Sequence, residues 1–410
     1  MYILLKSLLF IVLCLYVYNP YTIFGNLGIY VTMPFFLYGF FSARKYIVEQ
    51  YAAKVSIMVF ISIYAVYVSY VYEMLQFNHI RVTTNILIYL IFSVGVSVLV
   101  TKMKMSINDI FKYVFFVLVI NSIVVLLQVT FPVFRTVIEF FLLPSGNVDW
   151  SDGFRYRGIA SGGGAALSIL IPVALSLGLY LLKEKEIRWY TLMAASLVLT
   201  VSLFFIGRTG IALIPIVLTI YLLFSGAKNL LRALIIISIS LIMFVSLFEH
   251  IKDFVISVYG EAFFKYAFGF FLDGKQGIED EGTVGVLIDF VSVVPYTFPE
   301  VLTGVGFYGS GDFYPWTDSG YARMFLSVGF FFGGLYYIAY FMLFRKTFKL
   351  IPFLSVSVAL ILAISEVKEG LMVSGYAARV FILIMVMYEY MVRAPIVNMK
   401  VEKGRNESII

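Results

Sequence analysis

Long runs of apolar side chains limit what this chain can fold into more than any other feature. A helix needs about 20 predominantly apolar residues to cross a bilayer, and twelve such runs can be read along the sequence. They lie at residues 3–19, 25–41, 55–74, 83–100, 111–131, 159–182, 189–206, 209–224, 230–248, 323–344, 349–365 and 371–391. Only 13% of the 410 residues are charged, against about 25% in a soluble domain. The sequence therefore predicts an all-α polytopic membrane protein with about 12 transmembrane helices, in a single integral membrane domain over residues 1–410.

Basic residues predict how the chain crosses the membrane. They cluster in every second loop between the apolar runs, for example at Lys6, Arg44, Lys45, Lys102, Lys104, Lys183, Arg188, Arg345, Lys349 and Arg393. Cytoplasmic loops carry an excess of Lys and Arg. Both termini are therefore predicted to be cytoplasmic.

Arginine dominates among the basic residues of the other, outer side. These residues are Arg81, Arg135, Arg155, Arg157, Arg208, Arg323, Arg379, Lys252, Lys265, Lys275 and Lys368. The planar guanidinium group binds phosphate through two parallel hydrogen bonds, which lysine cannot match. The enrichment hints at an anionic ligand on the outer face.

Two outer loops are long, at residues 132–158 and 249–322. Apolar residues recur at three-four spacing over 251–270, which predicts an amphipathic helix on the membrane surface. Residues 283–294 are apolar but too short to span, and are expected to be interfacial or re-entrant. The large loop is acidic and holds Tyr308, Tyr314 and Trp316, which suit sugars through hydroxyl hydrogen bonds and ring stacking.

Cysteine and histidine are too scarce for metal or redox chemistry. One cysteine, Cys14, excludes an intramolecular disulfide and a cysteine metal cluster. The two histidines, His79 and His250, are expected to be interfacial, and no chemistry is assigned to them. Neither a metal nor a cofactor is expected.

Arg208 stands in the sequence FFIGRTGIALIP between two apolar runs, which could also be broken or re-entrant helices. A charge at such depth is a functional hypothesis by default, and Gly207 and Gly210 would let the backbone approach a ligand. The alternative is an arginine that extends to the lipid head groups at a helix end.

Arg155 and Arg157 precede the glycine-rich segment RGIASGGGAALSILIP. The free amides and positive dipole at the start of the following helix favour an anion, so this segment could hold a diphosphate. Glycines also promote close helix packing in membranes, and that alternative stays open.

Asp318 and Arg323 lie in TDSGYAR, where the large loop returns to the membrane. Asp318 is a candidate general base for a sugar hydroxyl, with Asp312 as an alternative. Aspartate at this position could instead cap the following helix. Arg379 lies in the last apolar run, with Glu366 and Glu369 at its outer mouth, and the simplest interpretation there is a structural ion pair.

Taken together, GRTG between two apolar runs, RGIASGGG before an earlier one and GVGFYG with TDSGY at the end of the large loop resemble the polysaccharide (O-antigen or capsule) polymerases of the Wzy type. The resemblance covers roughly residues 154–344. The number and sidedness of the predicted helices match as well.

The resemblance implies a metal-independent glycosyltransferase in the bacterial inner membrane, with its active site facing the periplasm. It would transfer a growing glycan from undecaprenyl diphosphate onto the next lipid-linked repeat unit. Arg157, Arg208, Arg323 and Arg155 would bind the diphosphate, Arg208 would also act in catalysis, and Asp318 would be the base. The implied partners are the lipid-linked oligosaccharide, the bilayer and a protein that regulates chain length; no nucleic acid is expected.

Two alternatives remain open. An O-antigen ligase, which moves a finished glycan onto lipid A core, shares the architecture, although related ligases carry a histidine near the position of Asp318. A lipid-linked oligosaccharide flippase would need charges along a cavity at mid-membrane. The predicted helices before Arg379 are almost free of such charges, which disfavours transport.

Overall fold

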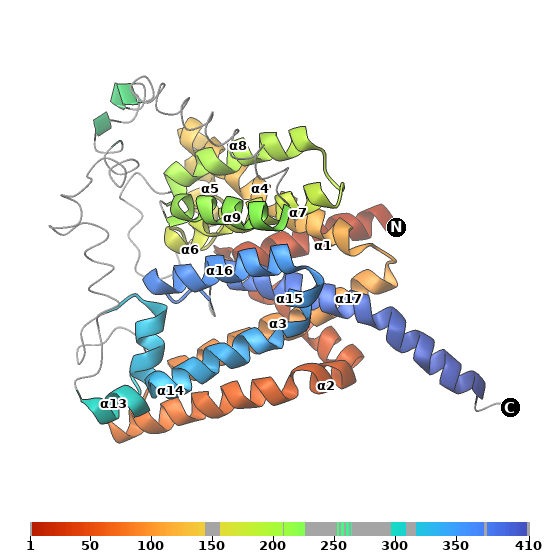
Figure 1. Ribbon diagram of the computed structural model, residues 1–410. Coiled ribbons are helices and arrows are strands. Elements are labelled where there is room, and N and C mark those ends of the chain that lie inside the picture. The colour runs from red at the N-terminus through yellow and green to blue at the C-terminus, as the bar shows by residue number, and fades with distance from the viewer. Residues whose placement is uncertain are drawn as a thin grey trace.

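The computed structural model describes residues 2–143, 156–207, 209–225, 297–308, 317–372 and 375–407, with a few positions between 252 and 264. The described residues up to 225 contain α1 (Tyr2–Tyr18), α2 (Leu27–Val71), α3 (Asn78–Lys102), α4 (Ile107–Thr130), α5 (Pro132–Phe141), α6 (Ala165–Ser168), α7 (Leu170–Lys183), α8 (Trp189–Ile206) and α9 (Thr209–Ser225). The described residues from 297 onward contain α13 (Phe298–Thr303), α14 (Gly320–Leu343), α15 (Arg345–Leu350), α16 (Pro352–Lys368) and α17 (Tyr376–Glu407). A small antiparallel hairpin of β1 (Tyr21–Thr22) and β2 (Gly25–Asn26) joins α1 to α2. The helices form a bundle with both termini at one end (Figure 1).

Apolar helices long enough to cross a membrane dominate the described residues. Six meet the requirements of length and composition: α2, α3, α4, the continuous stretch Ala165–Lys183, α8 and α14. Shorter apolar segments lie in α1, α9 and α16. An all-α membrane protein is thereby confirmed, whereas the count of twelve spans stays a prediction. The span predicted at 230–248 and the segment at 283–294 lie outside the described residues, as does most of the amphipathic helix predicted at 251–270.

The predicted spans 25–41 and 55–74 belong to one helical element with a sharp kink. Ala43 leaves the helical conformation (φ −132°, ψ 25°) within the 45 residues of α2. Before the kink, Gly39 abuts the backbone of Gly95, in the C-terminal half of α3. Beyond it, Ser62 hydrogen-bonds Thr83, near the start of α3, at 2.6 Å. The two halves therefore follow α3 in opposite directions, and the short inner loop expected between them is helical instead.

A second reversal divides α14 at Gly329, which has φ 76° and ψ 170°. The rings of Tyr321 and Tyr337 lie 5.2 Å apart, so the first half folds back toward the second (Figure 1). The turn is held from outside, because the backbone amide of Val305 donates to the carbonyl oxygen of Leu326 at 2.7 Å. The span predicted at 323–344 is thus two helical segments that meet at an angle.

The outer loop predicted at 132–158 begins with a helix. Pro132 starts α5, whose surface position leaves none of its residues buried. Arg135 and Glu139 form an ion pair along it at 2.8 Å, and Leu142 pairs with Thr22 of the hairpin through an isolated bridge. Because short amphipathic helices resemble loops in hydropathy alone, the sequence did not predict it.

The core of the bundle centres on α17. Each residue from Val380 to Met387 has an exposed fraction of 0%. A helix that is apolar all round is buried on every side. This position places Arg379, just before the buried run, at the centre of the bundle.

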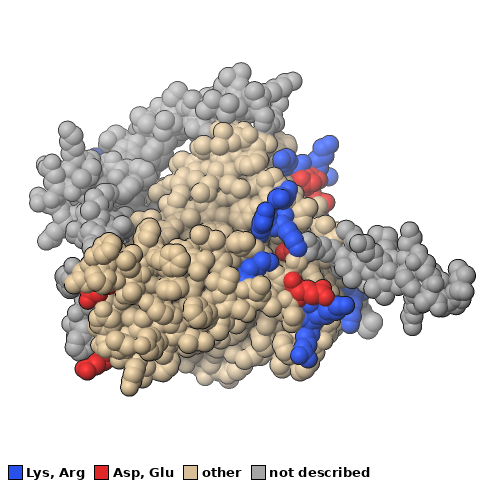
Figure 2. All heavy atoms as spheres, turned by 60° about the horizontal axis from the view of Figure 1, so that its bottom comes forward, with Lys and Arg blue, Asp and Glu red and all other residues tan. Residues whose placement is uncertain are grey.

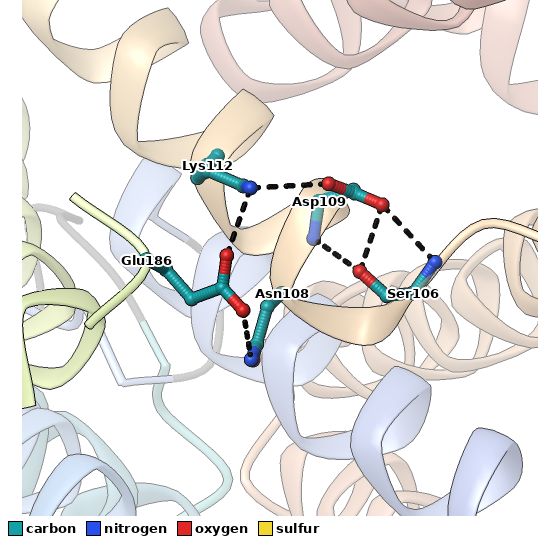
Figure 3. A network of polar contacts seen from close by, with 5 residues as sticks. All are labelled: Ser106, Asn108, Asp109, Lys112 and Glu186. Carbon is teal, nitrogen blue, oxygen red and sulfur yellow. Dashed lines mark hydrogen bonds and ion pairs between the residues drawn. The ribbon is translucent and has the colours of Figure 1, made fainter. Parts of the chain in front are cut away.

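Charged residues gather at the end of the bundle that carries the termini. Figure 2 shows Lys and Arg at that end of the displayed face, beside a wide uncharged surface. A polar cluster ties α4 to the connection between α7 and α8 there: Lys112 Nζ lies 2.9 Å from Glu186 Oε2 and 3.1 Å from Asp109 Oδ1 (Figure 3). Asn108 donates to the other oxygen of Glu186 at 3.0 Å. This is the end at which the basic loops were predicted, and it is called the inner end below.

Candidate functional site

A cavity of about 660 Å³ opens at the opposite, outer end of the bundle. We call it the arginine pocket, because Arg81, Arg323 and Arg379 line it together. The remaining lining residues are Asn19, Asn26, Ile29, Thr32, Met33, Asn78, Val82, Asn85, Ile88, Tyr89 and Tyr308. Among these described lining residues none is Asp or Glu, so the wall is positively charged and rich in amides.

One face of α3 builds a wall of the pocket. Asn78, Arg81, Asn85 and Tyr89 are spaced three or four residues apart and therefore share a face of the helix. Arg81 is exposed, and within the described part of the chain no carboxylate forms an ion pair with it. Its guanidinium group is thus available to a ligand.

Arg379 lies deeper in the pocket, at the start of α17. One terminal nitrogen donates to the carbonyl oxygen of Tyr16 at 2.9 Å, and the guanidinium group lies 5.1 Å from the ring centre of Tyr89. The Nε atom is buried and has no hydrogen-bond partner among the described residues. The ion pair expected with Glu366 or Glu369 is not formed. A cation at this depth without a carboxylate is a functional hypothesis.

Arg323 connects the pocket to the candidate base. It lines the pocket, and its Nη2 atom lies 3.0 Å from Oδ1 of Asp318. Burial raises the pKa of the Asp318 carboxyl, and the charges of Arg323 and Lys368 oppose that shift. The helix-capping alternative for Asp318 is wrong, because the side chain of Ser319 accepts the hydrogen bond from the first turn of α14.

Glu366 connects α14 to the segment between α16 and α17. It is fully buried; the Tyr337 hydroxyl donates to Oε1 at 2.9 Å and the Met372 amide to Oε2 at 2.6 Å. Its carboxylate packs so closely on Gly320 that no side chain fits there. Nearby, burial and the charge of Asp318 raise the pKa of Glu369. The sequence placed Glu366 at the mouth but did not predict this anchoring role.

Tyr308 from the predicted GVGFYG segment lines the pocket. Its backbone is held from two sides, because its amide donates to Gln76 Oε1 and its carbonyl oxygen accepts from Asn78 Nδ2, both at 2.9 Å. The other two aromatic residues named for sugar stacking, Tyr314 and Trp316, lie outside the described residues.

Arg157 lies apart from the pocket and faces the protein backbone. Its guanidinium donates to the carbonyl oxygens of Leu142 at 2.6 Å and of Leu143 and Ser161 at 3.4 Å. Only 5% of the residue is exposed. The contact with a diphosphate stays a prediction, while the structure gives Arg157 a role in holding the 156–161 segment.

Arg208, Arg155 and Asp312 lie outside the described residues. The glycines beside Arg208 are described, and they pack on the glycine-rich segment that follows Arg157. Gly210 donates its amide hydrogen to Ser168 Oγ at 3.2 Å, and Gly207 lies against the backbone of Gly164. The two motifs that were singled out separately are therefore neighbours.

His79 is buried, contrary to the expected interfacial position. Only 1% of it is exposed, with Nδ1 3.0 Å from Ser62 Oγ and Nε2 3.1 Å from Met324 Sδ. It thus joins α2, α3 and α14 beneath the pocket. No group of His, Cys, Asp and Glu in the described part of the chain could hold a metal ion.

No protein-family model, curated protein or solved structure matches this chain. What the site can do chemically follows from its lining alone. Three guanidinium groups and several amides line one pocket, and the described lining residues include no carboxylate; such a lining suits an anion with polar substituents. Ile29 and Met33 also line the pocket and have exposed fractions of 52% and 48% on the apolar surface. An amphiphile with an anionic head therefore matches the site.

Proposed function

We propose that the protein is a polysaccharide polymerase of the Wzy type. It transfers a growing glycan from undecaprenyl diphosphate onto the next lipid-linked repeat unit, at the outer face of a bacterial inner membrane. One observation carries the proposal: Arg81, Arg323 and Arg379 line a single pocket at the outer end of the bundle. Three convergent guanidinium groups suit a diphosphate better than any neutral ligand.

The exposed wall of the pocket supports a lipid-linked substrate. Ile29 and Met33 lie on the side of α2 that faces outward, and they also border the cavity. A polyprenyl chain can stay in the bilayer along this side while its diphosphate and sugar enter between the helices. The amides of Asn19, Asn78 and Asn85 can then bind sugar hydroxyls.

The chemistry is a substitution at the anomeric carbon of the donor glycan. The acceptor hydroxyl oxygen forms a bond to that carbon, the bond to the lipid diphosphate breaks, and the hydroxyl proton passes to Asp318. The pocket arginines stabilise the negative charge that develops on the departing diphosphate. Arg323 contacts Asp318 and also lines the pocket, and this contact supports a mechanism in which base and leaving group share one site.

The test is a polymerisation assay with the purified protein, its lipid-diphosphate repeat unit and EDTA, read as a ladder on a gel. Arg81→Ala and Arg323→Ala should each abolish the ladder. Arg135→Ala is the matched control, because this outer arginine lies on α5 in an ion pair with Glu139 and does not line the pocket.

A full ladder from both pocket variants would overturn the proposal. No ladder with the wild-type protein, but transfer of a preformed glycan to lipid A core, would identify a ligase instead. No transfer to either acceptor by folded protein would favour a transporter.

A further inference from the structure

A second concavity, of about 420 Å³, lies toward the inner end of the bundle, on the outside of α14. We call it the inner groove. It is lined by Tyr337, Ile338, Phe341 and Met342 of α14 and by Arg345 and Phe348 of α15. It shares no lining residue with the arginine pocket and plays no part in the proposed function.

The walls of the inner groove are apolar and exposed. Ile338 and Met342 have exposed fractions of 57% and 43%, and the rings of Phe341 and Phe348 lie 6.4 Å apart across the step from α14 to α15. In a helix that crosses a bilayer, such a surface faces lipid chains. The groove is therefore shaped for a hydrocarbon chain that follows α14.

Cations lie at the inner end of the groove. Arg345 begins α15, and Lys349 follows one turn later on the same face. Within the described residues neither has an ion-pair partner. Lys346 is engaged elsewhere: it donates to Gln50 Oε1 at 2.8 Å and lies 4.0 Å from the buried carboxylate of Glu389. The charges of Arg345 and Lys349 thus remain uncompensated beside an apolar groove.

We infer that the inner groove binds an anionic phospholipid of the cytoplasmic leaflet. One acyl chain lies along Ile338 and Met342, and the phosphate head group contacts Arg345 and Lys349. The distance between these two contacts matches the length of a lipid. Seven residues from Ile338 to Arg345 span about 10 Å of helix, which fits within one leaflet of the roughly 30 Å hydrocarbon core. Charge complementarity selects an anionic head group over a zwitterionic one.

A fluorescence experiment tests this binding. Phe348→Trp, reconstituted in nanodiscs, should be quenched more strongly by brominated phosphatidylglycerol than by brominated phosphatidylcholine, after subtraction of the parent protein with its three tryptophans. Adding Arg345→Ala and Lys349→Ala should lower the preference roughly fivefold for each charge removed. Lys45→Ala is the control, because that side chain is 90% exposed on an ion pair with Glu49 and does not line the groove.

Native mass spectrometry of the otherwise unchanged protein checks the same binding without the tryptophan. Phosphatidylglycerol adducts should persist on the wild type and on Lys45→Ala, and should be lost from the Arg345→Ala, Lys349→Ala variant. Equal retention by all three proteins would overturn the inference. Absence of quenching by either lipid would also overturn it and would indicate a protein surface, such as a second copy, over the groove.

Discussion

The hydroxyl oxygen of Tyr337 lies 3.4 Å from the backbone carbonyl oxygen of Gly320, although 17 residues separate them within α14. A straight helix would hold them about 25 Å apart. The reversal at Gly329 brings them together and keeps the first half of α14 at the outer end. Arg323, in that half, can therefore reach both Asp318 and the arginine pocket.

Gly329→Ala should destabilise the protein. The residue has φ 76°, and a Cβ there would lie 2.8 Å from the Gly304 amide nitrogen and still closer to the Leu302 carbonyl, so strain of about 1–3 kcal/mol is expected. Gly334→Ala is the control, since nothing lies within 4 Å of a Cβ there. Thermal unfolding in detergent should show a lower Tm for the first variant alone. Equal Tm values would contradict the reversal.

Arg157→Ala and Arg81→Ala should affect different properties. Arg157 donates to the backbone carbonyls of Leu142, Leu143 and Ser161. Its loss leaves these acceptors unpaired, which should lower the free energy of unfolding by about 1–3 kcal/mol and with it the Tm. Arg81 is exposed, so its loss should leave the Tm unchanged and abolish polymerisation. Unfolding and ladder assays on both variants separate the two roles. Unchanged stability of Arg157→Ala would show that its backbone contacts matter little.

Glu366→Gln should weaken the contacts that hold Glu366 to α14 and to the backbone of Met372. Both carboxylate oxygens accept hydrogen bonds, one from Tyr337 and one from the Met372 amide. An amide offers only one acceptor oxygen, so one donor loses its partner at a cost of about 1–3 kcal/mol. Denaturation of both proteins measures this cost. A variant as stable as the wild type would mean that water replaces the lost contact.

The polymerisation rate should fall on the acid side through the titration of Asp318. Burial raises the pKa of this carboxyl, and only the ionised form accepts a proton. The rate should therefore fall at a higher pH than an ordinary aspartate would give. Asp318→Asn should reduce the rate at every pH, whereas Asp318→Glu should keep some activity and a shifted profile. An acid limb that persists in Asp318→Asn would assign the base to another residue.

Stability at the inner end should depend on the charge of Glu186. Its hydrogen bond from Lys112 is the largest effect on its pKa, which is lowered. A lowered pKa stabilises the folded state above the ordinary glutamate value of about 4.3, and this contribution is lost as the pH falls through the folded value. The Tm difference between wild type and Glu186→Gln should therefore shrink in acid. A difference that is independent of pH would exclude this linkage.

The sequence predicted where most helices lie because membrane hydropathy depends on local composition. It did not predict the reversals at Ala43 and Gly329. Ala43 belongs to no turn motif, and Gly329 is one of several glycines in its segment. Both reversals depend on close packing against other elements, which a local pattern does not contain.

The candidate site was predicted only in part, because packing between distant elements brings some of its residues together. Arg323 and Asp318 stand in one short motif, and the structure pairs them. Arg81 and Arg379 are 298 residues apart in the chain, and only the packing of α3 on α17 brings them into one pocket. The bias toward arginine on the outer side was the one available signal. The predicted contact of Arg157 with a diphosphate stays a prediction, and its hydrogen bonds to nearby backbone carbonyls were not predicted, because they depend on how the chain folds around it.

The arginine pocket takes its walls from both ends of the chain, from Asn19 after α1 to Arg379 on α17. Synthesis proceeds from one end to the other, so the pocket cannot close until the last described helix has entered the membrane. A nascent chain that already exposes Arg81 and Arg323 still lacks Arg379 and the core of the bundle. The arginine pocket is thus completed only when α17 inserts.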